Sequence, residues 1–230
     1  MKTIGLIGGM SWESTVPYYR LINEGVKARL GGLHSSRLLL YNVDFAEIEE
    51  CMRLDKWQRI AEVLSGAAGT LEAAGADCVV LCSNSVHRVA AEIEASIDVP
   101  FLHIVDVTGA AIQAAGFTRV GLLGTRFVME QDFYSGRLAK HGLEVMTPED
   151  ADRGIVHRVI FEELVLGKVI ESSRNEYRRI MKDLAHKGAQ GIILGCTEIG
   201  MLVSPEDSPI PLFDTTAIHA RAIIDWALAE

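Results

Sequence analysis

Short apolar runs alternate along the chain with longer segments in which apolar residues recur at helical spacing. The apolar runs have the length of strands and cover about residues 3–8, 37–43, 78–82, 99–103, 119–123, 143–146, 191–195 and 210–213. The helical patterns cover about residues 14–29, 55–74, 85–96, 107–115, 129–141, 155–165, 171–187 and 215–229. Strands that alternate with helices in this way predict an α/β fold in which helices flank a mainly parallel sheet.

Two segments of the chain nearly repeat each other. Residues 75–85 and 188–198 each consist of a Gly-Ala turn, a continuous apolar run and then small polar residues. Aligned without gaps, the two segments place Ser83 opposite Cys196. Ligands of open α/β sheets bind at the carboxyl ends of the strands, so both residues are candidate site positions.

The repeat extends to other strands in the same order. Residues 4–10 match residues 120–126, and residues 99–102 resemble residues 210–213. Self-similarity at about half the chain length indicates two related lobes rather than a solenoid, whose period is roughly 20–50 residues.

We therefore expect two pseudo-symmetric lobes, each a mainly parallel sheet flanked by helices, with the active site in the cleft between them. The predicted N-terminal lobe is residues 1–105 together with 214–230, and the predicted C-terminal lobe is residues 106–213. A duplicated site of this kind suits a reaction that treats the two faces of one carbon atom alike.

Composition narrows the class of function. Apolar residues make up 49% of the 230 residues and charged residues 23%, which is ordinary for a globular protein with a substantial core. The net charge of −9 argues against a nucleic-acid partner, because such binding depends on Lys and Arg that neutralise phosphates. No apolar stretch approaches the roughly 20 residues that cross a bilayer, and no signal-peptide pattern is present. We therefore expect a cytoplasmic protein without membrane contact.

The four cysteines stand at positions 51, 78, 82 and 196. Their spacing does not form the CxxC pairs of a zinc site, so no metal site is expected. Cys78 and Cys82 are four residues apart in one apparent strand and should share a face. Cys196 differs because it stands at a strand end, where a helix beginning at Thr197–Glu198 would lower the pKa of its thiol. Such a cysteine is often structural, but its alignment with Ser83 favours a reactive thiol.

The glycine-rich segment Gly5–Ser11 invites comparison with a dinucleotide-binding turn. It lacks the G-x-G-x-x-G spacing and the Gly-Lys-Ser/Thr of a phosphate-binding loop. A turn that offers free backbone N–H groups to a small carboxylate fits better, and a tight turn without a ligand stays open as an alternative. The aromatic residues that follow at helical spacing are predicted to be core; they are Trp12, Tyr18, Tyr19 and Trp57.

Five motifs together carry a family resemblance. They are Gly8–Ser14, Asn84-Ser85, Gly124-Thr125, Met129–Tyr134 and Gly195–Glu198. In this combination the chain resembles the aspartate/glutamate racemases, and the first and fourth motifs look particularly like the enterobacterial broad-specificity or L-aspartate/glutamate-specific branch. The resemblance implies a racemase of aspartate/glutamate-like substrates that needs neither cofactor nor metal. It also implies that the partner is a small-molecule amino acid and that the protein is a homodimer.

The chemistry implied by the resemblance uses two cysteines on opposite faces of the substrate α-carbon. One thiolate removes the α-proton, and the opposite thiol returns a proton to the other face. This chain has Ser83 where the family has its first cysteine, while Cys82 stands one residue earlier and should point to the opposite face of the strand. We expect Cys196 to be the base and Ser83 its partner. Because a serine hydroxyl is a poor base, the two enantiomers should lose their α-proton at different rates. The resemblance to the L-specific branch implies that Cys196 takes the proton from the L-enantiomer, which gives a kinetic preference for that enantiomer.

Carried over by motif, the expected substrate contacts come from both halves of the chain. They are Met10, Asn84, Ser85, Thr125 and Thr197, with Met52 and Lys168 as weaker candidates. Lys168 would supply positive charge for a side-chain carboxylate. His87 follows Ser83 by one helical turn and either orients a substrate or simply packs, and the same alternatives hold for His157 and Glu198.

Two other functions stay open at this point. A single working thiol is also compatible with the related arylmalonate decarboxylases and maleate isomerases, which act on small dicarboxylates. A catalytically silent amino-acid-binding protein, in which loss of the first cysteine has ended turnover, is the other alternative.

Overall fold

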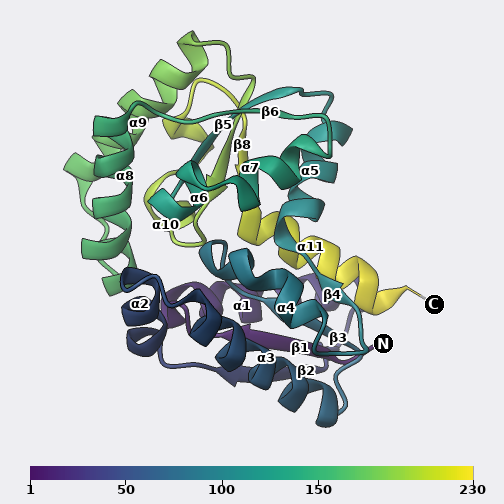
Figure 1. Ribbon diagram of the computed structural model, residues 1–230. Coiled ribbons are helices and arrows are strands. Elements are labelled where there is room, and N and C mark those ends of the chain that lie inside the picture. Colours follow the sequence, from purple (N-terminus) through teal and green to yellow (C-terminus); the bar gives the residue numbers. More distant parts are fainter. Residues whose placement is uncertain (230) are drawn as a thin grey trace. The chain divides into compact units, whose positions relative to one another are not determined.

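The computed structural model describes residues 1–229, which form two compact units. The first unit comprises Met1–Ile104 and the segment that begins at His219, and the second comprises Val105–Ile218. The chain therefore passes from one unit to the other twice, after Ile104 and after Ile218. Both units consist of a parallel sheet with helices packed against it (Figure 1).

The first unit is built on four parallel strands. They are β1 (Ile4–Gly8), β2 (Leu38–Asn42), β3 (Cys78–Leu81) and β4 (Phe101–Leu102), in the order β2-β1-β3-β4. The central strands β1 and β3 are buried along their whole length, which is why each is a continuous apolar run in the sequence.

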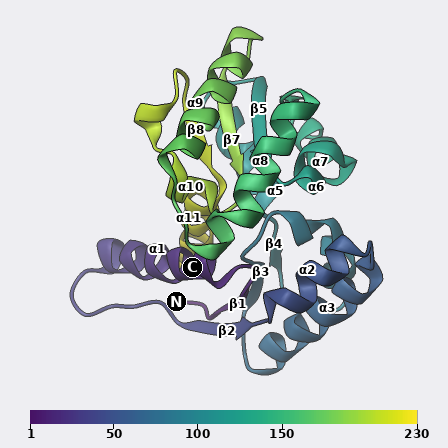
Figure 2. The same ribbon diagram turned by 90° about the vertical axis from the view of Figure 1, so that its left-hand side faces the viewer.

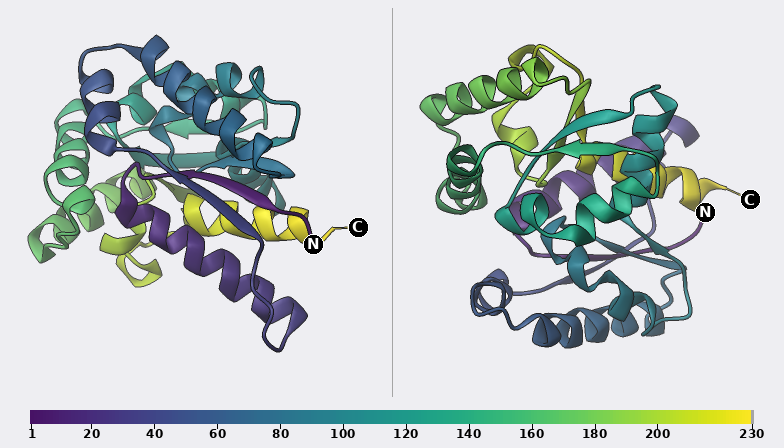
Figure 3. Two further views of the ribbon diagram at one scale, coloured as in Figure 1. Left: turned by 90° about the horizontal axis from the view of Figure 1, so that it is seen from below. Right: turned by 45° about the horizontal axis from the view of Figure 1, so that its top comes forward.

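Helices cover the first sheet. They are α1 (Trp12–Leu30), α2 (Phe45–Arg53), α3 (Trp57–Ala73), the 3₁₀ helix η1 (Ser85–Val89), α4 (Ala90–Glu94) and the last turns of α11 (Thr215–Leu228). The side chains of Ile4, Leu6 and Val80 pack with those of α1 and α11. These two helices lie side by side next to β1 in the left view of Figure 3. On the opposite face, Gly5 leaves room for Leu71 of α3.

The second unit repeats this plan. Its strands are β5 (Arg119–Gly124), β6 (Glu144–Met146), β7 (Gly191–Gly195) and β8 (Leu212–Asp214), in the order β6-β5-β7-β8. Its helices are α5 (Ile104–Ala114), α6 (Arg126–Glu130), α7 (Asp132–Ala139), α8 (Asp150–Glu162), η2 (Leu164–Leu166), α9 (Glu171–His186), α10 (Ile199–Leu202), η3 (Pro205–Asp207) and the start of α11. Helices α8 and α9 lie side by side on one face of the sheet (Figure 2).

Strand register confirms the duplication predicted from the sequence. Ile4 pairs with Cys78 between β1 and β3, and Val120 pairs with Gly191 between β5 and β7. These are the same pairs of positions that the alignment of the two halves makes equivalent. The next neighbours agree as well, because Val79 pairs with Phe101 where Ile192 pairs with Leu212. All eight predicted strands are present, and the predicted α/β fold of two helix-flanked parallel sheets is confirmed.

Some local predictions were wrong. The helix expected over residues 129–141 is two helices, α6 and α7, because Gln131 between them has an extended backbone. Helix α8 begins at Asp150, before the predicted start, and α2 was not predicted as a separate helix. Trp12 and Tyr19 are 59% and 57% exposed because they lie on the solvent side of α1, whereas Tyr18 is fully buried. Among the described residues, no helix is long and apolar enough to span a membrane.

Candidate active site

In the first unit, the polar residues predicted for the site follow the two central strands. Ile7 of β1 pairs with Leu81 of β3, and the Cys82 amide still donates to the Ile7 carbonyl over 2.9 Å. Ser83 is therefore the first residue after the end of the ladder. Ser83, Asn84 and Ser85 are buried, with 7%, 2% and 8% of their surface exposed.

The glycine turn after β1 uses its own backbone groups for structure. Gly9 has φ +93°, and its amide donates to the Thr15 hydroxyl over 2.8 Å. The Thr15 hydroxyl in turn donates to the Ser11 carbonyl. The Gly9 N–H is thus already occupied, and the expectation of a free N–H for a carboxylate is wrong at this position. A tight strand-to-helix turn is the interpretation that holds for Gly9.

Cys82 does not take the place of the missing first cysteine. Its side chain is fully buried in the cluster formed by the sheet with α1 and α11, together with Cys78. The two cysteines share a face, as predicted. Burial raises the pKa of Cys82 far above its ordinary value, and burial followed by the charge of Asp77 raises the pKa of Cys78 to about 12. Both are inert core thiols at neutral pH.

In the second unit, two neighbouring strand ends carry the predicted residues. Gly124 of β5 pairs with Gly195 of β7, so Thr125 and Cys196 are the first residues beyond two paired strand ends. Thr125 caps α6, because its hydroxyl accepts the Val128 amide over 3.4 Å. Cys196 is 9% exposed and packs with the side chains of α8, α9 and α10.

A carboxylate lies directly against the Cys196 thiol. The thiol donates to Oε2 of Glu198 over 3.0 Å, and the Thr197 hydroxyl donates to the same oxygen over 2.8 Å. Glu198 is 2% exposed. The Cys-Thr-Glu sequence thus forms one compact group in which a buried carboxylate accepts two hydrogen bonds. Sequence reasoning left the role of Glu198 open, although the i, i+2 spacing at a strand end was the available signal.

The pKa of Cys196 is raised, which makes the expected lowering by a helix wrong. Burial is the largest cause, and the negative charge and hydrogen bond of Glu198 add to it. The helix that follows, α10, has four residues and starts at Ile199, so its dipole is small. The backbone groups of Thr197 and Glu198 act in the opposite direction but do not prevail. Without a ligand, Cys196 is therefore a protonated thiol that donates to Glu198.

The remaining predicted residues occupy different kinds of position. Met10 and Met52 are each 4% exposed and belong to the core, Met52 on α2. Lys168 is exposed in the loop between η2 and α9, where its backbone amide donates to the Glu163 carbonyl. His157 accepts the Arg126 amide, and burial together with the Arg126 charge lowers its pKa. His87 bonds to the carbonyl of Ser83.

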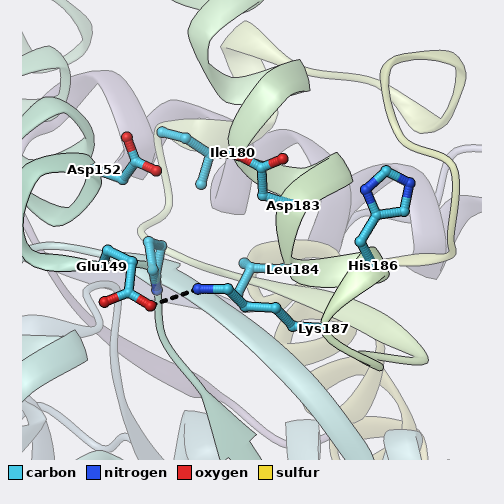
Figure 4. Close-up of a pocket in the computed structure, with 8 residues that line it drawn as sticks. Glu149, Asp152, Ile180, Asp183, Leu184, His186 and Lys187 are labelled. Carbon is cyan, nitrogen blue, oxygen red and sulfur yellow. Dashed lines mark hydrogen bonds and ion pairs between the residues drawn. The ribbon is translucent and has the colours of Figure 1, made fainter.

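A charged pocket of the second unit lies away from these strand ends (Figure 4). It is formed by α8 and α9 and lined by Glu149, Asp152, Asp183 and Lys187, among others. Lys187 pairs with Glu149, and Arg179 pairs with both aspartates. Lys187 precedes the start of β7, whereas Cys196 follows its end. Over residues 1–229, no group of three or more His, Cys, Asp or Glu is arranged to hold a metal ion.

Two topologically identical parallel sheets, each with polar residues beyond its paired central strands, define a duplicated α/β protein with a candidate thiol acid/base group. The model of the Asp/Glu/Hydantoin racemase family matches residues 7–223, and the chain belongs to this family. It is therefore an enzyme of the isomerase class. The resemblance inferred from the sequence is confirmed.

Several relatives match over nearly their full length. The crystal structure of a candidate Asp/Glu racemase from Yersinia pestis is 56% identical, has a TM-score of 0.93 and is matched over 100% of both chains. An aspartate racemase homologue from Pyrococcus horikoshii OT3 is 33% identical, has a TM-score of 0.86 and is also matched over 100% of both chains. The broad specificity amino-acid racemase RacX of Bacillus subtilis (strain 168) is 22% identical over 98% of each chain.

Proposed function

We propose that this protein racemises aspartate/glutamate-like amino acids by proton transfer at the α-carbon, with Cys196 as the base and Ser83 as its partner. The observation that carries the proposal is the hydrogen-bonded Cys196–Glu198 pair at the end of β7, in a chain of this family. The duplicated strand register supports it, because it makes Ser83 the equivalent of Cys196.

Because the pKa of Cys196 is raised, the proposed mechanism needs a group that accepts the thiol proton, and Glu198 is that group. A thiol must lose its proton before it can remove one from carbon, and burial opposes that loss. Glu198 already accepts the thiol hydrogen bond, so it takes the proton over the existing contact. The resulting thiolate then removes the α-proton of the L-enantiomer. An amino-acid ammonium group brought close to the thiolate would favour the same transfer by its positive charge.

Ser83 completes the reaction on the other face of the carbanion. Its hydroxyl gives a proton to the α-carbon and recovers one from water. Glu198 releases the thiol proton to solvent, so every group regains its starting charge. The reverse task is harder, because a serine alkoxide is far less accessible than a thiolate whose free pKa is about 8.5. Hydrogen loss from the L-enantiomer is therefore faster than from the D-enantiomer. The equilibrium between the enantiomers stays at unity, so the preference is kinetic.

Most of the proposed substrate contacts come from residues that follow strand ends. The proposed contacts are Met10, Asn84, Ser85, Thr125 and Thr197, with Met52 and Lys168 as weaker candidates. Met10 and Met52 contribute apolar contact and backbone groups, since both side chains lie in the core. Lys168 provides charge for a side-chain carboxylate against the net charge of −9. A Lys168→Ala variant should lose activity on acidic amino acids more than on neutral ones, and equal losses would remove Lys168 from this role.

The remaining features of the proposal come from the sequence. Catalysis without a cofactor, assembly as a homodimer and a cytoplasmic location follow from the family resemblance and composition. Without an electron sink, the carbanion must be stabilised by fixed hydrogen bonds and dipoles. The buried side chains of Asn84 and Thr125 are the groups suited to this, since the Thr197 hydroxyl already donates to Glu198.

Proton exchange in D2O tests the proposal. Purified protein is incubated with L- and D-aspartate and L- and D-glutamate, and deuterium at the α-carbon and enantiomer composition are followed by NMR and chiral chromatography. Deuterium should enter the L-enantiomer first, and D product should follow. If none of these four substrates, nor a panel of neutral and basic amino acids, exchanges its α-proton, the racemase proposal is wrong.

A second candidate function is favoured by one observation, the presence of a cysteine at only one of the two aligned positions 83 and 196. Cys78 and Cys82 are inert core thiols, so Cys196 acts without a thiol partner at the Ser83 position. A decarboxylase or cis–trans isomerase of small dicarboxylates needs one working thiol. Release of carbon dioxide from malonates, or of fumarate from maleate, without amino-acid exchange would select this function. Saturable amino-acid binding without any turnover would indicate a binding protein.

A further inference from the structure

The ring of His87 contacts the backbone of Ser83. His87 is 3% exposed, and its Nδ1 lies 2.6 Å from the Ser83 carbonyl oxygen. His87 stands on η1, the 3₁₀ helix that begins two residues after Ser83. Ser83 itself lies beyond the last residue of β3, Leu81. Ser83 is therefore outside the paired part of β3, and the short contact with His87 restrains its backbone carbonyl.

A second contact of the His87 ring shows which of its two nitrogens carries the hydrogen. The backbone amide of Ile104 points at Nε2 over 3.4 Å, and an amide N–H can only donate. Nε2 must therefore hold the lone pair, and Nδ1 carries the hydrogen and donates it to the Ser83 carbonyl. The ring thus connects Ser83, which follows β3, to Ile104, the first residue of α5. It donates one hydrogen bond, from Nδ1, and accepts the other, at Nε2.

Three other rings, those of the buried His103 and His219 and of the half-buried Phe101, lie close to the His87 ring. The centroid of His103 lies 4.5 Å away, that of Phe101 5.7 Å and that of His219 6.5 Å. His219 is itself fixed, because Nε2 lies 2.8 Å from the Leu102 carbonyl and Nδ1 lies 2.9 Å from the Tyr18 hydroxyl. Since a carbonyl only accepts, His219 donates from Nε2 and accepts at Nδ1. Burial lowers the pKa of His219 to about 4, so this ring is neutral at pH 7.

The orientation of Ser83 affects the proposed proton transfer, because its hydroxyl is a weak acid that has to donate to one face of the carbanion. Well-oriented groups gain much of their effectiveness from position alone, and a displacement of about 1 Å can cost roughly 100-fold. A thiol in the same place would tolerate misalignment better, since it gives up its proton more readily. With serine at position 83, proton transfer therefore depends more on a rigid local backbone than it would with cysteine.

We propose that His87 is a positioning residue for Ser83, which holds the Ser83 carbonyl through Nδ1–H so that the hydroxyl faces the substrate α-carbon. This inference rests on the proposed function for its consequence, but the His87–Ser83 contact itself can be tested without any activity. The expected consequence is specific. Loss of the contact slows proton delivery by Ser83 and leaves proton removal by Cys196 nearly intact.

Two substitutions of His87 each keep one of the hydrogen bonds of the ring and remove the other. In His87→Asn, the side-chain NH2 replaces Nδ1–H and keeps the donor to the Ser83 carbonyl. In His87→Gln, the longer side chain places its oxygen near the position of Nε2, which keeps the acceptor for Ile104 and removes the donor to Ser83. His103→Asn is the matched control, since it disturbs the same group of buried rings at another residue. Thermal unfolding of each variant establishes that it is folded.

The kinetic measurement compares two rates for L-substrate in D2O. One is deuterium entry with retention of configuration, which reports Cys196, and the other is formation of the D-enantiomer, which also requires Ser83. His87→Gln should lower the ratio of inversion to retained exchange by about tenfold or more, while His87→Asn and His103→Asn keep it within about threefold. Equal losses of both rates in His87→Gln would mean a merely structural role and would overturn the inference.

A spectroscopic measurement keeps the two proposals distinguishable. In the wild-type protein, the ring nitrogens of His87 should show the Nδ1–H tautomer. The 13C shift of the Ser83 carbonyl should change in His87→Gln and change much less in His87→Asn. If the wild-type protein exchanges no α-proton, the proposed function fails, and the Ser83 shift still decides whether His87 holds Ser83. An unchanged Ser83 shift in His87→Gln would overturn the inference whatever the activity.

Discussion

The Cys196 thiol donates a hydrogen bond to the Glu198 carboxylate over 3.0 Å, from one buried side chain to another two residues further along the chain. This contact opposes ionisation of the thiol and at the same time provides an acceptor for its proton. A thiol that is protonated at rest is protected from alkylation and oxidation, which require the thiolate. Activation would then follow substrate binding.

Replacing Glu198 by glutamine should separate these two effects. The glutamine removes the negative charge, so the pKa of Cys196 should fall, and it removes the proton acceptor, so exchange from L-substrate should slow by about 100-fold. The pKa is measured as the pH dependence of alkylation in a Cys51→Ser background, because Cys51 is the more accessible thiol. Glu163→Gln, at a buried carboxylate paired with Arg158, is the control and should leave this titration unmoved. A Glu198→Gln protein with unchanged exchange would exclude the acceptor role.

The free energy of unfolding at alkaline pH should depend on the protonation of the three buried thiols. The pKa values of Cys78, Cys82 and Cys196 are all raised in the folded state, mainly by burial. Above a pH of about 8.5, the unfolded chain releases these protons while the folded chain keeps them, so the unfolded state binds fewer protons. The free energy of unfolding should then fall as pH rises, by up to about 1.4 kcal/mol per pH unit for each thiol.

Urea unfolding at a series of pH values between about 8.5 and 9.5 measures this slope, below the range in which the buried Tyr134 and Tyr177, whose pKa values are also raised, add to it. Cys82→Ala should reduce the slope by about a third, independently of any constant loss from the cavity that it leaves. A slope that is identical in wild type and Cys82→Ala would contradict the assignment of buried, protonated thiols.

The duplicated fold could be predicted from the sequence because it depends on repeated local signals. The Gly-Ala turns at Gly75 and Gly188 and the apolar runs that follow them are contiguous in the chain. Both glycines have positive φ, as helix-terminating glycines commonly do. The strand register then follows, since a shift by one residue would turn each strand's apolar residues to the other face.

The chemistry of Cys196 could not be predicted in the same way. Its pKa depends on burial by α8 and α9, which are distant in sequence, and on the direction of one carboxylate. The His87 contacts depend likewise on Ile104 and on rings brought together by the fold. Trp12 and Tyr19 resemble core residues in composition, and only the orientation of α1 decides that they are exposed.

Two glycine-to-alanine substitutions should change stability in opposite directions. At Gly9, φ is +93° and an added Cβ would lie 2.3 Å from the Val43 carbonyl oxygen, so Gly9→Ala should destabilise by about 3 kcal/mol. At Gly66, inside α3, an added Cβ meets nothing within 4 Å. Gly66→Ala should stabilise by about 1 kcal/mol, because alanine loses less backbone entropy in a helix. Urea denaturation measures both, and a stabilising Gly9→Ala would contradict the turn geometry.

The last prediction concerns the exchange of roles between Ser83 and Cys196. Ser83→Cys supplies a thiol on the face that lacks one, so α-proton exchange from the D-enantiomer should rise by at least about tenfold, because a thiol with a free pKa near 8.5 is a far better base than serine. Cys196→Ser should abolish exchange from the L-enantiomer. The readout is exchange in D2O rather than net racemisation, because an equilibrium constant of unity forces kcat/KM for racemisation to be equal in the two directions. Cys82→Ser is the control, since Cys82 is a core thiol and its loss should leave the L-to-D ratio of exchange unchanged. Equal initial exchange from the two enantiomers in the wild-type protein would contradict the assignment of faces, and full activity of Cys196→Ser would overturn the thiol mechanism.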